Sequence, residues 1–332
     1  MSGAGPTLAL PGVSPVLAQR LRAGLDRVEA RLHEAVDHED PFLAGASGHL
    51  LVGGKRLRPM LTLLSAEACD GVNDAVVAAA VGVELTHLAS LYHDDVMDEA
   101  AVRHGRPSAP AAYGNSTAIL VGDLLFGKAS EVVAGLGAEA VLIQARTFVR
   151  LCAGQIRDAR PRPEGVDSVA YYLGVLADKT GVLIATAARY GAMFGGGDGA
   201  TVAAMREYGE RLGVAFQLAD DIIDIASESG ASGKTPGTDL REGVDTLPVL
   251  YAKASTDPHD ARLRELLSGP LVDPERHAEA LRLLRAHPAL EQAREHARGV
   301  GRGAVDALDP VPDGEAKVAL AALVGSVVDR VA

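Results

Sequence analysis

Two clusters of aspartates have the residue types and the spacing to hold metal ions. The first is Asp94-Asp95-Val96-Met97-Asp98 and the second is Asp220-Asp221-Ile222-Ile223-Asp224. In a helix, residues four apart lie one turn apart on the same face, so each cluster presents its first and last carboxylates together, with the second beside them. One such cluster arises readily by chance in an acidic chain. Two clusters with identical spacing are a far more specific signal.

The surroundings of the two clusters indicate a bound cation. Both clusters follow otherwise apolar segments, and three carboxylates on one helical face repel one another, so a plain solvated face explains them poorly. Carboxylate oxygens suit Mg²⁺, which takes one or two carboxylates per ion and completes its shell with water and substrate phosphate oxygens. The clusters therefore predict a magnesium enzyme that acts on a phosphorylated substrate.

Three short basic segments could supply positive charge to that substrate. They are Gly53–Pro59, which contains Lys55, Arg56 and Arg58, then Arg103–Arg106, and finally Gly233-Lys234. Guanidinium forks match the geometry of phosphate oxygens. Each segment alone is more typical of a solvated turn. In an acidic chain, however, such focused basic segments are informative.

Helical periodicity dominates the segments that must position these residues. Ser14-Pro15 is a helix start signal, and apolar residues follow it at spacings of four and three up to Val36. The other predicted long helices are Met60–Cys69, Asp74–Met97, Ser116–Val133, Ala138–Arg157, Val169–Phe194 and Thr201–Ile225, with shorter charged helices after them. Alternating strand patterns are absent. We expect the segment Ser227–Thr238, which follows the second cluster, to be a mobile active-site loop.

Bulk composition restricts the class of protein. The chain has 332 residues, 48% of them hydrophobic and 4% aromatic, which suits closely packed helices. A net charge of −12 disfavours nucleic acid as a partner, because phosphate backbones are held mainly by Lys and Arg. Two widely spaced cysteines fit a reducing compartment, and no signal peptide or membrane span is predicted. We expect a cytoplasmic protein with one domain over residues 1–332, in which residues 1–12 are flexible.

The ordered motifs resemble those of the trans-isoprenyl diphosphate synthases. They are GGKRLRP from Gly53, HLASLYHDDVMDEAAVRHGRPS from His87, LADKTG from Leu176, FQLADDIIDI from Phe216 and GKTPGTDLREGVDTLPVLYA from Gly233. The resemblance runs from about Leu50 to about Lys253, and the combined motifs are highly specific. It implies an all-α fold, a single-domain antiparallel helix bundle around a deep central cavity, with the two aspartate clusters facing each other at its mouth.

The resemblance also implies a role for each candidate residue. With substrate bound, three Mg²⁺ ions would hold the allylic diphosphate. These ions would be surrounded by the six aspartates of the two clusters, Asp94, Asp95, Asp98, Asp220, Asp221 and Asp224. Isopentenyl diphosphate would be held by Lys55, Arg58 and His87, with Arg56 in the same basic patch. The allylic substrate or its developing positive carbon would contact Arg103, Lys179, Thr180, Gln217 and Lys234. Read alone, His87 is more typical of a core histidine, although its spacing from Asp94 gives both residues one helix face.

The implied reaction has three steps. They are ionisation of the allylic diphosphate, attack by the isopentenyl double bond and loss of a proton. No side chain stands out as the base, so the released diphosphate is the preferred proton acceptor. One residue departs from the family pattern, which usually has Arg-Arg-Gly where this chain has Arg103-His104-Gly105. A neutral imidazole offers one donor where guanidinium offers five, so we expect weaker isopentenyl diphosphate binding that strengthens as pH falls.

The residues upstream of Asp94 bear on product length. A helical turn of about 5.4 Å is close to the length of one isoprene unit, so each turn lined by small residues admits about one more unit. Ser90 and Ala89, then Thr86 and Leu85, and then Gly82 and Val81 include no aromatic plug. We therefore favour a medium or long polyprenyl product of the quinone side-chain type, with geranylgeranyl diphosphate as the closest competitor.

Other classes of protein are less compatible with the motifs. A terpene cyclase would carry an Asn/Ser/Glu-type second metal motif, and a di-iron bundle would need more Glu-x-x-His pairs than Glu84–His87. A non-catalytic prenyltransferase subunit would have eroded aspartate clusters, although His104 keeps this reading open. Family members commonly form homodimers, and the predicted helices Ser116–Val133 and Ala138–Val149 could form the interface or belong to the core. A long lipid product suggests transient membrane contact during its release.

Overall fold

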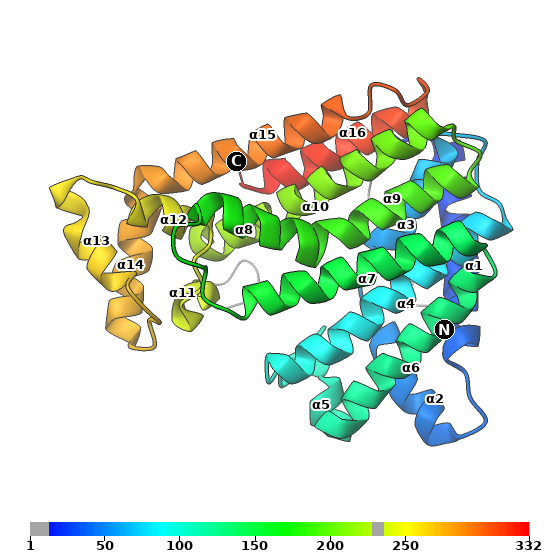
Figure 1. Cartoon of the computed structure of the whole chain (residues 1–332), viewed down its shortest axis with the longest axis horizontal. Coiled ribbons are helices and arrows are strands. Elements are labelled where there is room, and N and C mark those ends of the chain that lie inside the picture. The colour runs from blue at the N-terminus through cyan, green and yellow to red at the C-terminus, as the bar shows by residue number, and fades with distance from the viewer. Residues whose placement is uncertain (1–12, 228–235, 332) are drawn as a thin grey trace. The chain divides into compact units, whose positions relative to one another are not determined.

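The computed structural model describes residues 13–227 and 236–331, and helices make up almost all of its regular structure (Figure 1). The prediction of an all-α fold is confirmed. The exception in the described residues is a short hairpin in which β1 (Val102–Arg103) pairs antiparallel with β2 (Arg106–Pro107). The α-helices are α1 (Pro15–Val36), α2 (Pro41–Ser47), α3 (Leu57–Glu67), α4 (Asp74–Met97), α5 (Ala109–Tyr113), α6 (Asn115–Ala134), α7 (Ala138–Asp158), α8 (Ser168–Leu176), α9 (Val182–Phe194), α10 (Gly199–Ala226), α11 (Thr238–Glu242), α12 (Leu247–Lys253), α13 (Ala261–Leu266), α14 (Pro274–Ala286), α15 (Pro288–Asp306) and α16 (Glu315–Val328).

Local sequence signals explain where the helices begin. The Ser14 side chain accepts the N–H of Leu17, and Pro15 takes the first position of α1, where a missing N–H costs nothing. Helices α2, α5 and α14 repeat this combination of a capping side chain and a proline in the first turn, and α12 has the proline without the cap. The predicted helices correspond to α1, α3, α4, α6, α7 and α10 with small differences at their ends.

One predicted helix is interrupted. The segment expected as a single helix over Val169–Phe194 consists of α8, a π-helical turn over Ala177–Gly181, and α9. In this turn the N–H of Val182 bonds to the carbonyl of Ala177, five residues earlier. Hydrophobic periodicity cannot detect one inserted residue, because the apolar pattern resumes on the next turn.

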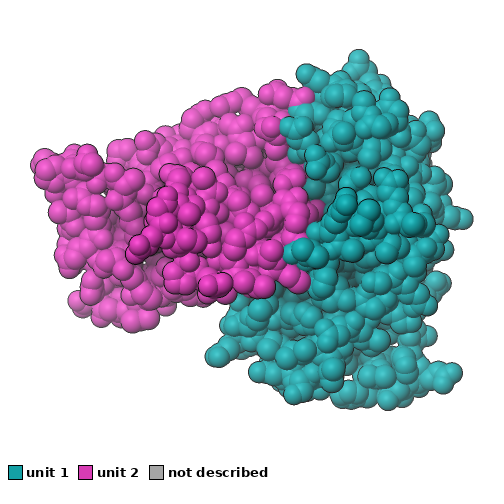
Figure 2. All heavy atoms as spheres, viewed as in Figure 1, with its two compact units in different colours: residues 1–149, 183–209, 307–322 teal, residues 150–182, 210–306, 323–332 magenta. Residues whose placement is uncertain are grey.

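The chain divides into two compact units (Figure 2). Unit 1 comprises residues 1–149, 183–209 and 307–322, and unit 2 comprises residues 150–182, 210–306 and 323–332. Several of the boundaries fall inside helices, namely α7, α9, α10 and α16.

Helix α4 forms the centre of unit 1. It packs most extensively against α6 and also contacts α3 and α1. Asn73 caps its N-terminus by accepting the N–H of Val76, at 3.0 Å. One face, including Val81, Leu85 and Ala89, joins the apolar core formed with α1 and α6. The helix ends at Met97, within the first aspartate cluster.

Two apolar stretches are long enough to cross a membrane by length and composition alone. They are Asp74–Met97 and Ser168–Phe194, and 72% and 44% of their most apolar windows are buried inside the protein. The core helix of a soluble protein meets the same criteria, so these stretches are weak indications of membrane spans.

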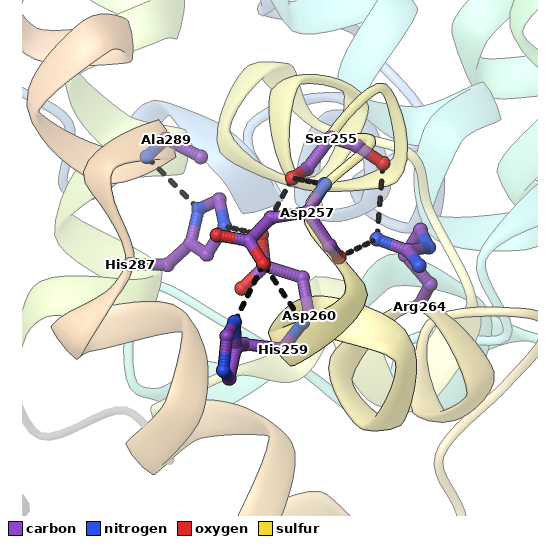
Figure 3. A network of polar contacts seen from close by, with 7 residues as sticks. All are labelled: Ser255, Asp257, His259, Asp260, Arg264, His287 and Ala289. Atoms are coloured by element: carbon purple, nitrogen blue, oxygen red, sulfur yellow. Dashed lines mark hydrogen bonds and ion pairs between the residues drawn. The ribbon is translucent and has the colours of Figure 1, made fainter.

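In unit 2, α12 packs against α15, α13 and α8, and α14 contacts α13 and α15. A polar network fixes the loop between α12 and α13 (Figure 3). Arg264 donates to the carbonyls of Ser255 and Asp257, at 3.0 and 2.8 Å. The Asp260 carboxylate accepts from the Ser255 hydroxyl and from Nε2 of His287. These hydrogen bonds, first that of Ser255 and then that of His287, lower the pKa of Asp260.

Candidate active site

The first aspartate cluster lies at the C-terminal end of α4. Asp94 is half-buried, Asp95 is fully buried and Asp98 is exposed just beyond the helix. Arg103 donates to Oδ1 of Asp95 from Nε at 2.7 Å and from Nη2 at 2.6 Å. The other oxygen, Oδ2, is buried and has no hydrogen-bond partner among the described residues. A buried carboxylate oxygen in this condition is costly unless a ligand satisfies it.

The β1–β2 hairpin brings two of the basic segments together. His104 and Gly105 form its turn with φ angles of 52° and 74°, the left-handed conformation that a two-residue hairpin turn requires. The His104 side chain packs close to Gly53 and Gly54. A Cβ atom added to Gly53 would be 3.4 Å from the Cβ of His104 and 3.5 Å from its ring nitrogen Nδ1. Burial, followed by the nearby charges of Arg103 and Arg56, lowers the pKa of His104, and Asp95 opposes this effect.

Arg58 and His87 complete this basic region. Burial lowers the pKa of Arg58, against the effect of Glu84, and its Nε atom has no hydrogen-bond partner among the described residues. Burial lowers the pKa of His87 well below its usual range, and the nearby basic groups, first that of Arg58, lower it further, so the ring is neutral near pH 7. Lys55 is exposed. The described structure therefore gathers cationic and neutral donors in one region of unit 1.

Arg56 differs from its neighbours because its donors are used within the protein. It caps α3 in a left-handed conformation with φ of 49°. Its guanidinium contacts the carboxylate of Glu29 through two nitrogens, donates to Glu84 at 3.1 Å and donates to the carbonyl of Leu51 at 2.6 Å. These contacts favour a role in holding the Gly53–Pro59 segment in place. Substrate binding by Arg56 stays a prediction.

The second aspartate cluster lies near the C-terminal end of α10, in unit 2. Asp220 pairs with Arg330 at 3.1 Å. Asp221 is buried and accepts from the Tyr172 hydroxyl and, at 2.9 Å, from Nε2 of Gln217. Burial raises the pKa of Asp221 to about 6, although these two hydrogen bonds oppose the shift.

Asp224 is held by the turn that precedes α11, and α14 supports that turn. The Asp224 carboxylate accepts the N–H groups of Thr238 and Asp239, at 3.3 and 3.2 Å. The buried His277 of α14 contacts the Gly237 carbonyl through Nε2 at 2.8 Å. Eight residues further along α14, Arg285 donates to the carbonyls of Ile225 and Ser227, which satisfies the C-terminal end of α10.

The π turn carries Lys179 and Thr180. Lys179 pairs with Asp158 of α7 at 2.6 Å, and the Thr180 hydroxyl contacts Gln217 at 3.5 Å. Gln217 in turn contacts Asp221, so Thr180 and the second cluster are linked within unit 2. Lys234 and most of the predicted loop Ser227–Thr238 lie outside the described residues, as do residues 1–12, which the sequence predicted to be flexible.

The donor chemistry of the aspartate clusters fits Mg²⁺. Within the described parts of the chain, no three carboxylate, imidazole or thiol groups converge into a complete metal centre. The hard carboxylate oxygens, and the buried, unsatisfied Oδ2 of Asp95 in particular, are the type of ligand that Mg²⁺ takes beside substrate oxygens and water. A metal site completed by substrate is consistent with both observations.

Several residues that shape the site were missed from the sequence. Glu84 holds Arg56, Tyr172 bonds Asp221, and Arg330 pairs with Asp220. Glu84 had a usable signal, since it is the single acidic residue between Asp74 and Asp94 in an otherwise apolar stretch, which indicates a buried ion pair. Tyr172 and Arg330 had none, because their partners are distant along the chain.

Comparison with known proteins supports this description. The family model for polyprenyl synthetase matches residues 40–284. The chain is 48% identical over 330 residues to nonaprenyl diphosphate synthase of Mycobacterium tuberculosis (strain ATCC 25618 / H37Rv), covering 98% of each chain. Geranylgeranyl pyrophosphate synthase from Corynebacterium glutamicum, solved with calcium and isoprenyl diphosphate, superposes with a TM-score of 0.87 at 42% identity, covering 96% of this chain and 98% of that one. Decaprenyl diphosphate synthase from Rhodobacter capsulatus gives a TM-score of 0.87 at 34% identity, with coverage of 96% and 99%.

A bundle of helices with two aspartate clusters and a basic region beside one of them defines a class of metal-dependent prenyltransferases. The extent of the family match shows that this chain belongs to the polyprenyl synthetase family.

Proposed function

We propose that this protein condenses isopentenyl diphosphate with an allylic diphosphate to give an all-trans polyprenyl diphosphate of medium or long chain. The observation that carries this proposal is the group of anion-binding side chains next to Asp95 in unit 1. Arg103 is bonded to Asp95, His104 packs on the Gly53-Gly54 pair, and the Arg58 Nε atom has no hydrogen-bond partner in the part of the chain that the structure describes. Membership of the polyprenyl synthetase family and similarity to a nonaprenyl diphosphate synthase support it.

The basic region is the proposed site for isopentenyl diphosphate. Lys55 and Arg58 supply positive charge, and the neutral His87 and His104 rings supply further hydrogen bonds to phosphate oxygens. A bound phosphate would accept a hydrogen bond from the Arg58 Nε atom, for which the described residues provide no acceptor. Arg56 positions this segment through Glu29 and Glu84.

The allylic diphosphate is the proposed ligand of the aspartate clusters and their neighbours. With substrate bound, three Mg²⁺ ions would be held by the aspartates of the two clusters, Asp94, Asp95, Asp98, Asp220, Asp221 and Asp224. The substrate itself would be contacted by Arg103, Lys179, Thr180, Gln217 and Lys234. Bound Mg²⁺ supplies Lewis-acid charge neutralisation for the departing diphosphate. Lys179 adds a positive charge near that leaving group, which lowers the barrier to breaking the allylic C–O bond.

The remaining steps need little acid–base chemistry from the protein. Thr180 and Gln217 present oxygen dipoles that stabilise the developing allylic cation, and Gln217 is oriented by its hydrogen bond to Asp221. The isopentenyl double bond attacks that cation and a proton leaves the adjacent carbon. We assign the proton to the released diphosphate, because His87, with its lowered pKa, is a weak base.

The packing of α4 separates the residues that bear on product length into two faces. Val81, Leu85 and Ala89 belong to the core shared with α1 and α6. Gly82 and Thr86 instead line a narrow internal gap within unit 1, whose other walls are Val83 of α4, Val133 of α6, Gln144 and Thr147 of α7, and Leu183, Thr186 and Tyr190 of α9. Product length therefore depends on the Gly82–Thr86 face, which continues through Ser90 to Asp94 at spacings of four.

The gap lies about 12 to 18 Å below Asp94 along α4, which corresponds to two or three isoprene units. A Cβ atom added to Gly82 would be 2.6 Å from Cγ2 of Val133, and Gln144 contacts the Thr86 hydroxyl at 3.4 Å. A medium or long chain must pass these side chains. This constriction is also the observation that favours the shorter geranylgeranyl diphosphate as the alternative product.

We further propose that the protein works in the cytoplasm as a homodimer. Exposed apolar side chains gather on α6 and α7 of unit 1, and the rings of Phe126 and Phe148 join these helices with centroids 4.3 Å apart. Leu120 and Val149 are each 66% exposed, which is unfavourable unless a partner covers them. A long isoprenoid product would require brief contact with a membrane for its release.

Incubation with radiolabelled isopentenyl diphosphate, an allylic primer and Mg²⁺ tests the main proposal. We expect elongated chains from the wild-type protein, resolved by chromatography after dephosphorylation. Asp94→Ala and Asp220→Ala should each reduce incorporation at least a hundredfold, since each removes a ligand for the charge that stabilises the leaving group. Folded wild-type protein that elongates none of the geranyl, farnesyl and geranylgeranyl primers would contradict the proposal.

A further inference from the structure

One face of α7 in unit 2 contacts the π turn that carries Lys179 and Thr180. This face consists of Arg150, Gly154, Arg157 and Asp158, at the i, i+4, i+7 and i+8 positions that share one side of a helix. All four residues contact or closely approach the segment 178–179. Insertions of one residue into a helix are uncommon and often mark functional sites.

The charged residues of this face form a network centred on Asp178. Arg150 donates from Nε to Oδ1 of Asp178 at 2.6 Å, and Arg157 donates from Nη2 to Oδ2 of the same carboxylate. Arg150 also donates from Nη2 to Glu210 of α10 at 2.7 Å. The Asp178 side chain is only 16% exposed, so its pairing is less screened by solvent than that of a surface ion pair. Both carboxylate oxygens are thus held from one direction.

Two glycines allow the backbone to approach closely around the turn. A Cβ atom added to Gly154 would lie 2.6 Å from the backbone nitrogen of Lys179, a distance at which something must shift. A Cβ atom added to Gly181 would lie 3.1 Å from the carbonyl oxygen of Glu210. The turn is therefore held between α7 and α10 by backbone packing as well as by charge.

The two residues that follow Asp178 make contacts of their own within unit 2. Lys179 reaches Asp158, and Thr180 reaches Gln217, which contacts Asp221. If the turn rotated about the helix axis by one residue, Lys179 and Thr180 would no longer point toward these partners. The anchor on Asp178 prevents that rotation.

We propose that Arg150, Arg157 and Asp178 are positioning residues that fix the π turn so that Lys179 and Thr180 meet the allylic diphosphate. The inference rests on the proposed function of Lys179 and Thr180. Arg150 and Arg157 act through Asp178 and do not touch either substrate. Loss of this anchor therefore affects the allylic substrate selectively, because the isopentenyl diphosphate site is built from other residues.

The test compares the steady-state constants of Arg150→Gln with those of Arg262→Gln. Arg262 is a matched control in unit 2, since it also bridges two carboxylates, those of Glu265 and Glu279, but on the exposed surface. We expect Arg150→Gln to raise KM for the allylic primer and lower kcat/KM by about tenfold to a hundredfold, the range that small misplacement produces. KM for isopentenyl diphosphate should stay within about twofold, and Arg150→Lys should recover part of the loss.

Each outcome has a defined meaning. Constants for Arg150→Gln that equal those of Arg262→Gln, or KM values that rise together for both substrates, overturn the positioning role. If Arg150→Gln does not fold, Asp178→Asn is measured by the same criteria. If the wild-type protein elongates no primer, the proposed function fails. The anchor is then judged by calorimetric binding of geranylgeranyl diphosphate with Mg²⁺, which the positioning role requires to weaken in Arg150→Gln and not in Arg262→Gln.

Discussion

His104 sits in the turn of the hairpin that links the first aspartate cluster to the Gly53–Pro59 segment. At pH 7.5 its ring is neutral, because burial and the charges of Arg103 and Arg56 lower its pKa while Asp95 only partly opposes them. An arginine in this place would carry a permanent charge and more donors. The left-handed φ of 52° is tolerable for either residue in a hairpin turn, so the difference is one of recognition and not of folding.

We expect His104→Arg to lower KM for isopentenyl diphosphate roughly tenfold at pH 7.5, the equivalent of about 1.4 kcal/mol. In the wild-type protein, protonation of His104 at a pH below the ordinary pKa of an imidazole adds a positive charge, so KM for isopentenyl diphosphate should decrease as the solution becomes acidic. The variant controls for titration of the substrate itself. A wild-type profile that follows the variant's profile would show that His104 does not contact the diphosphate.

Ser90 tests the separation of the two faces of α4. It lies one turn below Asp94 on the face that continues to Thr86 and Gly82, so Ser90→Phe should block chain growth and shorten the main product. Ala89→Phe is the matched control, since Ala89 is fully buried in the core shared with α6. That variant should lose about 1–3 kcal/mol of stability through overpacking. Chromatography of the dephosphorylated products and thermal unfolding distinguish the two effects, and equal shortening by both variants would contradict the assignment.

At the scale of elements, α14 holds the turn that fixes Asp224. His277 contacts the Gly237 carbonyl, and the N–H groups of the next two residues bond to the Asp224 carboxylate. Through these contacts α14, which carries none of the predicted site residues, holds the Asp224 carboxylate in position. These contacts also show why the cluster cannot be understood from α10 alone.

We expect His277→Ala to raise the Mg²⁺ concentration needed for half-maximal activity several-fold. The variant leaves the Gly237 carbonyl without its partner, which costs about 1–3 kcal/mol for a buried polar group and loosens the turn. His259→Ala is the control, because that side chain is 92% exposed and belongs to the same unit. An unchanged Mg²⁺ dependence in His277→Ala, with reduced thermal stability, would limit α14 to a structural role.

The helices were largely predictable from the sequence, and the details that orient the site were not. Ser14-Pro15 and the spacing of Leu17 to Val36 predicted α1 because capping and amphipathic burial are both local effects. The π turn at Ala177–Gly181 depends on packing against Gly154 and on ion pairs with α7, which no local pattern encodes. Likewise, the aspartate spacing identified the clusters, but the partners of Asp95 and Asp221 come from other elements.

At the scale of the whole molecule, the exposed apolar surface of unit 1 predicts the oligomeric state. Leu120→Glu or Val149→Glu should convert a particle of twice the chain mass into one of 34.3 kDa, as measured by light scattering. A charge at the centre of an apolar interface is left unpaired and desolvated, which opposes association. Val272→Glu is the control, because Val272 is 82% exposed in unit 2 and lies outside this surface. A wild-type protein of single-chain mass would contradict the proposed homodimer.

The assembly of unit 1 from distant stretches has a consequence for synthesis on the ribosome. The Ser14 hydroxyl donates to Glu315 at 2.8 Å, 301 positions later in the chain, so α1 is completed by residues translated long after it. The Tyr208 hydroxyl likewise donates to the Leu320 carbonyl at 2.9 Å. At about 5–20 residues per second, α1 waits roughly 15 to 60 s for those partners. The nascent chain should therefore depend on chaperone protection for longer than a protein of equal length whose contacts are local.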